Sequence, residues 1–329
     1  MADKNIKQQL ITYFPQEAKA LSLNEIQALI PEKVAERTLR RWLVEEVEKG
    51  RLIRSGQKRS TRYQLNLERP KANFAFLSGV EESRQTAIIK QLRDLWTHSS
   101  TALEGNTLTL GDTHFVLEEG ITISGKPLKD HQEVMGHAGA IEILYQSLNE
   151  PVTRELCLAL HKAVQTEIVY DIDKPYGAWK NRPNGAYTVG TDDNPIYLEY
   201  ALPQHVPALM GEVINTLNEI KIDEIDLDNA HRCYAKFHAA IAHIHPFWDG
   251  NGRIARLLAN IPLLKAGLPP VVIPSKTRRH YIQLLAAYEM NVGQLNSKTG
   301  AWPDPKQLQE FESFCFDCYK ETKQIISVS

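Results

Sequence analysis

The sequence predicts a mainly α-helical protein with a small β excursion, preceded by a separate small module. Apolar residues recur at helical spacing through most of the chain beyond residue 73. By contrast, residues 175–200 are rich in Gly, Pro, Asn, Asp and Tyr, as in a turn-rich hairpin. The 329 residues suffice for one well-covered core and a smaller module, and the 43% hydrophobic content is ordinary for a globular protein.

The first 68 residues are predicted to form the small module. Three helical patterns occupy 6–14, 23–30 and 36–49, and the last of these repeats apolar residues on one face. Two short alternating strands around a basic, Gly-containing turn fit residues 51–65. Three helices followed by a basic hairpin resemble a winged helix-turn-helix domain, and residues 69–329 then form the second region.

This module makes DNA binding one candidate function. Residues 51–63 contain no acid and five basic side chains: Arg51, Arg54, Lys58, Arg59 and Arg62. The preceding helix is ambivalent, because three arginines between 37 and 41 are opposed by three glutamates between 45 and 48. We therefore expect residues 37–63 to contact either DNA or another protein.

Composition and charge narrow the other partners. A formal net charge of −2 gives no global attraction to nucleic acid or to a membrane. The most apolar stretch, 254–273, is interrupted by charged residues and prolines, which predicts a core segment and no membrane span. The N-terminus lacks a signal-peptide pattern, and four cysteines do not make a disulfide framework, so we expect a cytoplasmic protein.

The segment from His245 to Arg256, with the sequence HPFWDGNGRIAR, predicts a phosphate site. A helical pattern ends at His245, and another begins near residue 254. The Asp-Gly-Asn-Gly turn between them can expose consecutive backbone N–H groups at a helix N-terminus, which is an anion cradle.

The side chains of this loop supply the remaining chemistry. Arg253 and Arg256 add fixed positive charge suited to phosphate oxygens. Asp249 offers a hard oxygen ligand for Mg²⁺, and His245 can take a proton near neutral pH. Together these groups describe a site for attack on a phosphate ester.

Other interpretations of the loop are weaker. Residues 250–255 match the dinucleotide pattern G-x-G-x-x-[GA], but they follow a helical pattern instead of a strand, and no acidic residue lies between 253 and 289. No P-loop motif occurs in the chain. An ordinary turn with a buried histidine explains single residues of the string, but not the whole of it.

The string matches the signature H-P-F-x-[DE]-G-N-G-R-x-x-R at every specified position, so the chain resembles the Fic family. The resemblance implies a helical fold that holds ATP and Mg²⁺ and presents the α-phosphate to a Ser, Thr or Tyr hydroxyl of a target protein. His245 would be the general base, and Asp249 would hold Mg²⁺. The anion hole would be lined by Gly250, Asn251, Gly252 and Arg253, while Arg256 would reach the γ-phosphate.

Two further segments fit the resemblance. The family's flap, which pairs with the target backbone as an added strand, corresponds to residues 175–200 and brings Val189 and Gly190 to the nucleotide. The helix after the motif would help to form the adenine pocket, with Tyr281 and Tyr288. Core packing is the alternative for either tyrosine.

Residues 100–105 resemble the Fic inhibitory motif [ST]-x-x-x-E-[GN], on a helix expected over about 93–105. In the family this glutamate pairs with the second arginine of the motif and blocks the γ-phosphate position. Ser100 and Glu104 would then act on Arg256 and make this an autoinhibited member. The alternative is that Glu104 is a solvated helix residue.

The predicted function is therefore a protein adenylyltransferase that transfers AMP from ATP to a target hydroxyl and to itself. Within the enzyme class, the alternatives are another nucleotidyl donor, phosphocholine, phosphate, or removal of AMP with Glu104 positioning water. In a different class, the alternative is a DNA-binding regulator. The expected partner is a target protein docked along the flap, and a homodimer is a further open expectation.

Overall fold

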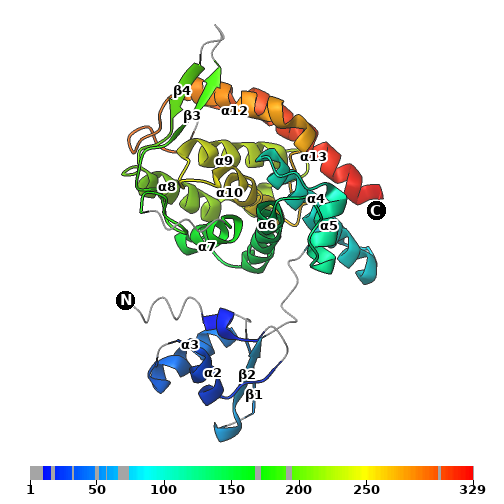
Figure 1. Cartoon of the computed structure of the whole chain (residues 1–329), viewed down its shortest axis with the longest axis vertical. Coiled ribbons are helices and arrows are strands. Elements are labelled where there is room, and N and C mark those ends of the chain that lie inside the picture. Colours follow the sequence, from blue (N-terminus) through cyan, green and yellow to red (C-terminus); the bar gives the residue numbers. More distant parts are fainter. Residues whose placement is uncertain are drawn as a thin grey trace. The chain divides into compact units, whose positions relative to one another are not determined.

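The computed structural model describes residues 10–15, 19–31, 33–48, 52–56, 58–65, 74–166, 172–189, 195–302 and 305–328. The chain divides into two compact units, Met1–Lys71 and Ala72–Ser329 (Figure 1). The boundary expected at residue 68 falls within 66–73, outside the described residues.

The first unit has its own apolar core, to which helices and a hairpin contribute. Ser22 begins the second helix with a capping box: its hydroxyl accepts from Glu25 N–H, and the Glu25 carboxylate accepts from Ser22 N–H. The helix expected over 6–14 is observed as a short 3₁₀ turn, and residues 6–9 lie outside the described part of the chain. The elements are η1 (Leu10–Tyr13), α2 (Leu23–Leu29), α3 (Glu36–Glu48), β1 (Leu52–Ser55), η2 (Lys58–Ser60) and β2 (Arg62–Leu65), with β1 and β2 antiparallel.

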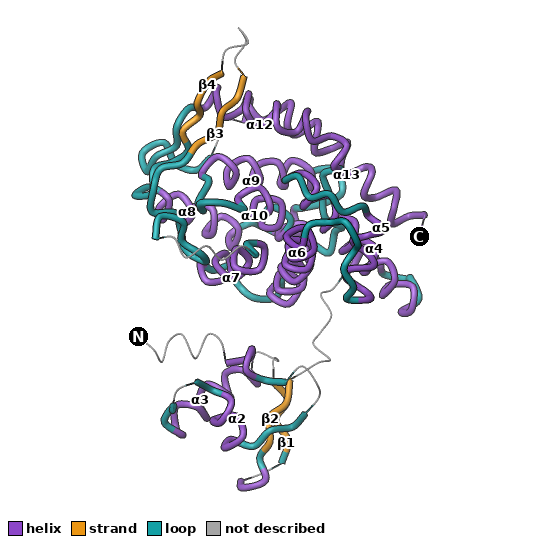
Figure 2. Tube along the Cα trace, viewed as in Figure 1, coloured by secondary structure: helices purple, strands orange, loops and turns teal. Residues whose placement is uncertain are grey.

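The second unit is a bundle of helices with one hairpin, which confirms the mainly helical prediction (Figure 2). The helices are α4 (Glu82–Leu103), α5 (Leu110–Glu119), α6 (Leu128–Ser147), α7 (Arg154–Val164), α8 (Val206–Glu219), α9 (Ala230–Ile244), α10 (Asn251–Leu258), α11 (Ile261–Lys265), α12 (Arg278–Val292) and α13 (Gln309–Val328). Short 3₁₀ turns are η3 (Ala75–Leu77), η4 (Ile222–Glu224), η5 (Ser275–Thr277) and η6 (Pro305–Leu308). Among the described residues, no helix combines the length and apolar character that crossing a membrane requires.

Helix α9 lies at the centre of this unit and packs against α8, α10, α11 and α13 (Figure 1). Its alanines, such as Ala235 and Ala239, are fully buried, and small side chains let the neighbouring helices approach closely. The core therefore holds both ends of the loop between α9 and α10 in a fixed position.

The helix that carries the inhibitory motif is longer than expected. Helix α4 begins at Glu82, well before residue 93, because buried positions such as Ile88 and Leu92 continue its packed face toward the N-terminus. It ends at Leu103, since Gly105 adopts φ +104, which other residues rarely adopt.

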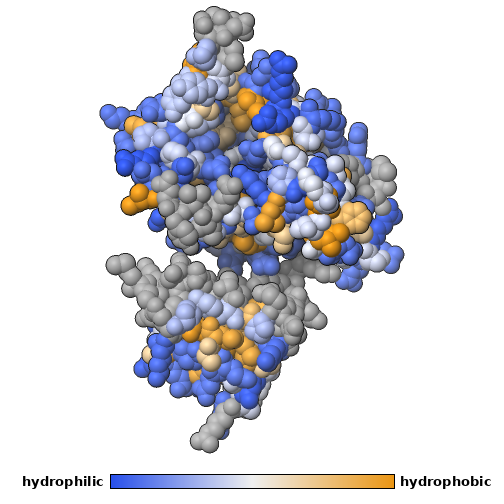
Figure 3. Space-filling view, viewed as in Figure 1, coloured by the Kyte–Doolittle hydropathy of each residue, from blue (hydrophilic) through white to orange (hydrophobic). Residues whose placement is uncertain are grey.

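The turn-rich segment contains the hairpin of β3 (Gly185–Val189) and β4 (Pro195–Glu199). The strands are antiparallel, with Tyr187 opposite Tyr197, and they extend from the helical body (Figure 1). Both tyrosines are exposed, and hydrophilic residues cover much of the face of the helical unit in view, with apolar patches between them (Figure 3). The hairpin therefore exposes strand edges and aromatic side chains.

Candidate active site

The loop that follows α9 begins at His245. This residue has φ +52 and ψ +60, a left-handed conformation that few non-glycine residues adopt. Its N–H still donates to Ile241 O over 3.1 Å, so the chain turns sharply without losing the last helical hydrogen bond. The helix therefore delivers His245 at its end, where the sequence pattern predicted it.

The His245 imidazole is held in one tautomer. Its Nδ1 lies 3.2 Å from Ala242 O, and because a carbonyl oxygen only accepts, Nδ1 carries the proton and Nε2 keeps its lone pair. The ring stacks on Tyr200, with ring centroids 3.7 Å apart and planes 3° apart. Burial, and then the charge of Lys180, lowers the pKa of His245 to about 3. The ring is therefore in the neutral form that a base requires.

Backbone N–H groups gather at the N-terminus of α10. Gly250 caps the helix with φ +77, and the first intrahelical bond runs from Ile254 N–H to Gly250 O, so the N–H groups of residues 251–253 precede it. The Asn251 amide closes the loop, since its Oδ1 accepts from Phe247 N–H (2.8 Å) and its Nδ2 donates to Phe247 O (2.9 Å). Asn251 thus shapes the cradle with its side chain and lines it with its backbone.

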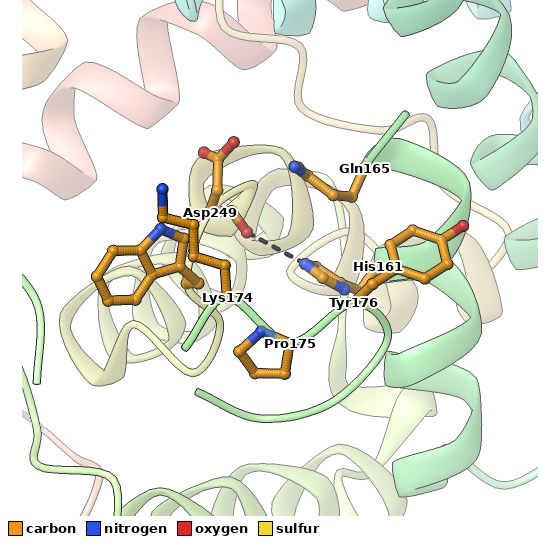
Figure 4. Close-up of a pocket in the computed structure, with 7 residues that line it drawn as sticks. His161, Gln165, Lys174, Pro175, Tyr176 and Asp249 are labelled. Atoms are coloured by element: carbon orange, nitrogen blue, oxygen red, sulfur yellow. Dashed lines mark hydrogen bonds between the residues drawn. The ribbon is translucent and has the colours of Figure 1, made fainter. Parts of the chain in front are cut away.

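A cavity of about 320 Å³ adjoins the Asp249 carboxylate, which is 64% exposed (Figure 4). It is lined by His161, Gln165, Lys174, Pro175, Tyr176, Trp248 and Asp249. The Gly177 N–H donates to His161 Nδ1 (3.1 Å), so His161 Nε2 donates to Asp249 O (3.2 Å). The His161 ring also stacks on the Phe247 ring, with centroids 3.9 Å apart. Through these contacts, α7 holds the loop in place beside Asp249, the candidate metal ligand.

The Arg253 guanidinium is buried against the C-terminal end of α7. Its Nη1 donates to Val164 O (2.7 Å), where helix carbonyls carry partial negative charge. Its Nη2 lies 3.9 Å from Asp249 Oδ2. The Nε atom is a buried donor without a partner in the described part of the chain, as expected of a group that binds a ligand.

The Arg256 guanidinium is 2% exposed and is bonded on all sides. Its Nε donates to Ser100 Oγ (2.9 Å), and its Nη2 donates to Ser100 O (2.9 Å) and to Glu104 Oε1 (2.6 Å). Its Nη1 donates to the Tyr281 hydroxyl (3.2 Å), which also lies 3.1 Å from His238 Nε2. The structure therefore brings Ser100, Glu104 and Arg256 together.

The Glu104 carboxylate also reaches the anion cradle. A Cβ atom on Gly252 would lie 2.5 Å from Glu104 Oε1 and 3.0 Å from Arg256 Nη1. Only a residue without a side chain fits here without displacing a neighbour. The first turn of α10 thus already faces an anionic group, in agreement with its positive helix end.

Four other residues were predicted to contact the nucleotide. Tyr281 lies against Arg256 in the core, and Tyr288 is buried with its ring 5.6 Å from His243. Gly190 and the side chain of Val189 lie outside the described residues. The roles of these four in binding a nucleotide stay predictions.

Three residues of the site were not predicted from the sequence: His161, Lys180 and Tyr200. His161 had a signal, because the helical period of α7 places it on the buried face with Cys157 and Val164. Lys180 and Tyr200 flank the hairpin, where no periodicity indicates burial, yet both are buried.

Residues 151–263, which hold α7, the hairpin, α9 and the loop, match the Fic/DOC family. The chain contains a Fic domain. This confirms the resemblance inferred from the loop, and the match covers the His245–Arg256 segment in full.

Curated relatives agree with this assignment of the Fic domain. The chain is 34% identical over 221 residues to protein adenylyltransferase fic-1 of Caenorhabditis elegans, covering 64% of this chain and 39% of that protein. It is 32% identical over 215 residues to protein adenylyltransferase Fic of Drosophila erecta, covering 64% and 40%. The chain thus spans about two fifths of the length of the curated relatives it matches.

Solved structures share the fold. A Fic domain-containing signaling protein from Bacteroides thetaiotaomicron matches with a TM-score of 0.64 and 25% identity, over 78% of this chain and 95% of that one. Residues 134–508 of Fic-1 from Caenorhabditis elegans match with a TM-score of 0.58 and 21% identity, over 99% and 83%.

Proposed function

We propose that this protein is an adenylyltransferase that transfers AMP from ATP to a hydroxyl of a target protein and of itself. The observation that carries the proposal is the loop geometry: a neutral imidazole, an N–H cradle and two arginines on one short segment. The names of the curated relatives support the same activity.

The chemistry follows from the positions of the groups. His245 Nε2 takes the proton of the attacking Ser, Thr or Tyr hydroxyl. That oxygen forms a bond to the α-phosphorus while the bond to the β-phosphate oxygen breaks, and pyrophosphate leaves. The backbone of residues 250–253 and the guanidinium of Arg253 stabilise the developing charge. Arg256 holds the γ-phosphate.

A Mg²⁺ ion fits the residues at the cavity. Asp249 provides an exposed carboxylate, and the described residues contain no cluster of three His, Cys, Asp or Glu that could hold a metal alone. One carboxylate completed by phosphate oxygens and water is the usual environment of Mg²⁺ beside a nucleotide. The ion would neutralise phosphate charge, and it would do so only with the nucleotide bound.

Glu104 is proposed to inhibit the enzyme. Its carboxylate accepts a hydrogen bond from Arg256 and lies close to Gly252, where the γ-phosphate would make its contacts. Two anions in one cradle repel each other, so ATP would bind in a position that is not productive for transfer.

The experiment that tests the function compares donors directly. The purified protein and its Glu104→Gly variant are incubated with ATP labelled at the α- or the γ-phosphate, and the products are identified by mass spectrometry. Label from the α-phosphate alone, on a hydroxyl side chain, supports AMP transfer. Label from the γ-phosphate would indicate phosphorylation instead, and loss of a pre-attached AMP would indicate de-AMPylation.

DNA binding by residues 37–63 is a second candidate function. Arg54 and Lys58 of the hairpin are exposed, which favours phosphate contact. On α3, however, Arg40 pairs with Glu36 (2.7 Å) and Arg41 lies 4.0 Å from Glu45, which reduces the positive potential of that helix. A gel shift that weakens with salt would support this function, and alanines at Arg54, Lys58, Arg59 and Arg62 should lower the salt slope by about one unit per lost contact.

We also propose that the chain forms a homodimer. Apolar side chains gather over α5 and α6 (Figure 3), and the exposed ones include Phe115, Leu128 and Met135. A second copy of the chain would cover them, and sedimentation of a Phe115→Glu, Leu128→Glu variant tests this.

We also propose a cytoplasmic location. All four cysteines are free thiols, as expected in a reducing compartment.

A further inference from the structure

The two ends of the β3–β4 hairpin are attached to the loop that contains His245. Asn184 immediately precedes β3, and Tyr200 immediately follows β4. Tyr200 N–H donates to Asn184 O over 3.1 Å, so these two residues close the base of the hairpin.

Lys180 and Asn184 fasten this base to the loop backbone. Lys180 N–H donates to Pro246 O (2.9 Å), and Asn184 Nδ2 donates to Phe247 O (3.1 Å). Lys180 Nζ donates to Asn184 Oδ1 over 2.6 Å, which orients the amide for that contact. The Lys180 side chain is 2% exposed, and burying an ammonium group is costly unless it has such a partner.

Tyr200 extends the connection to the imidazole. Its ring covers one face of the His245 ring at 3.7 Å, while Lys180 Nζ lies 5.9 Å from the Tyr200 ring centroid. Gln294 Nε2 donates to Tyr200 O (3.1 Å), which helps to hold the tyrosine backbone in place. None of these side chains reaches Arg253 or Arg256 in the contacts described above.

We infer that Tyr200 and Lys180 are positioning residues that hold the His245 imidazole in place and connect the hairpin rigidly to this general base. The inference rests on the proposed role of His245 as general base. A target segment that pairs with a strand of the hairpin would then act, through this connection, on the position of the same His245 imidazole that accepts its proton. Tyr200 restricts ring rotation by contact, and Lys180 acts by hydrogen bonding and by charge.

The electrostatic surroundings of His245 agree with this assignment. The groups that face it are Lys180 from the segment before the hairpin, Tyr200 after it, His243 from α9 and Asp249 from the loop. Burial and Lys180 lower the pKa of the imidazole, whereas Asp249 raises it. Removing the covering ring or the ammonium should therefore move the pKa back up toward the ordinary histidine value.

The test uses the full chain with Tyr200→Leu, Tyr200→Phe and Lys180→Met. Tyr200→Leu should lower kcat for AMP transfer by about 10–100-fold, since small misplacements of a reacting group cost rates of this order. ATP affinity should not change, and Tyr200→Phe should behave like wild type because it keeps the ring. In ¹³C-histidine NMR titrations, assigned with His245→Gln, the His245 pKa should rise in Tyr200→Leu and in Lys180→Met.

The NMR titration separates this inference from the proposed function. An unchanged His245 pKa in both Tyr200→Leu and Lys180→Met would overturn the positioning roles, whatever the enzyme does. Equal loss of activity in Tyr200→Phe and Tyr200→Leu would also overturn the stacking argument, because the hydroxyl would then matter. If Tyr200→Leu fails to fold, Lys180→Met alone decides the outcome through the same titration. Full AMP transfer by His245→Ala would refute the base assignment instead.

Discussion

The Glu104 carboxylate lies 2.6 Å from the Arg256 guanidinium, although 152 residues separate them in the sequence. Glu104 remains 39% exposed, whereas Arg256 is almost fully buried. Ser100 and Tyr281 also hold the guanidinium, so Arg256 keeps its orientation when Glu104 is removed. We therefore propose that Arg256 is a preorganised anion receptor, in which a phosphate of the nucleotide would replace the Glu104 carboxylate.

Glu104→Gly should increase AMP transfer and self-modification. A hydrogen bond to a charged group contributes about 1.5–3 kcal/mol, so release of Arg256 corresponds to a gain of roughly 10–100-fold. Rates of α-phosphate labelling over a range of ATP and Mg²⁺ concentrations measure this gain. Glu119→Gly, at an exposed position on α5, is the matched control. Equal labelling of Glu104→Gly and wild type would make Glu104 an ordinary helix residue, and a decrease would indicate a catalytic role.

His245→Ala should abolish most of the transfer while leaving folding and ATP binding intact. Loss of a general base lowers the rate by about 10²–10⁴-fold. Single-turnover kinetics and calorimetric ATP titration separate the two effects, with His205→Ala outside the loop as the control. Near-normal transfer by a folded His245→Ala protein would refute the assignment.

The effect of Gly252→Ala on the free energy of unfolding should depend on Glu104. The new methyl group would meet the Glu104 carboxylate at 2.5 Å and displace it, because the carboxylate is the more mobile partner. In a Glu104→Gly background that conflict disappears. A double-mutant cycle of unfolding free energies should give a coupling of about 0.5–2 kcal/mol. Additive effects would show that the two residues do not interact.

Glu289 should make stability depend on pH. Burial raises its pKa from 4.5 to about 8, so between these values the folded protein keeps a proton that the unfolded chain releases. The free energy of unfolding should therefore decrease as the pH rises, by up to about 1.4 kcal/mol per unit from this group. Glu289→Gln should flatten that decline in denaturant unfolding series, whereas Glu310→Gln, at an exposed site, should not. Parallel pH profiles for wild type and Glu289→Gln would contradict the shift.

Deletion of residues 1–71 should leave a folded Fic unit with its nucleotide chemistry. The two units have separate apolar cores, and every residue proposed to act in nucleotide transfer lies in the second unit, Ala72–Ser329. Circular dichroism, thermal unfolding and α-phosphate labelling of the shortened chain test this. Loss of nucleotide transfer by a well-folded fragment would show that the N-terminal module takes part in catalysis.

The sequence by itself determined the features that depend on neighbouring residues. Helical periodicity and the glycine turn placed His245 at a helix end and the N–H cradle at the next helix start, because both are set by local backbone chemistry. The length and specificity of the loop motif were sufficient to predict the Fic family. The match between Ser100–Gly105 and a known motif predicted the pairing with Arg256, which physical reasoning on the sequence could not have done.

Tertiary structure alone decided which distant side chains complete the site. Tyr200 stacks on His245, and His161 donates to the Asp249 backbone across 88 residues of sequence. It also decided that Tyr281 lies against Arg256 and that Lys180 is buried beside the loop. These contacts arise from how helices and a hairpin pack around α9. Packing depends on the shapes of all the surfaces at once, so a local pattern of residues does not determine it.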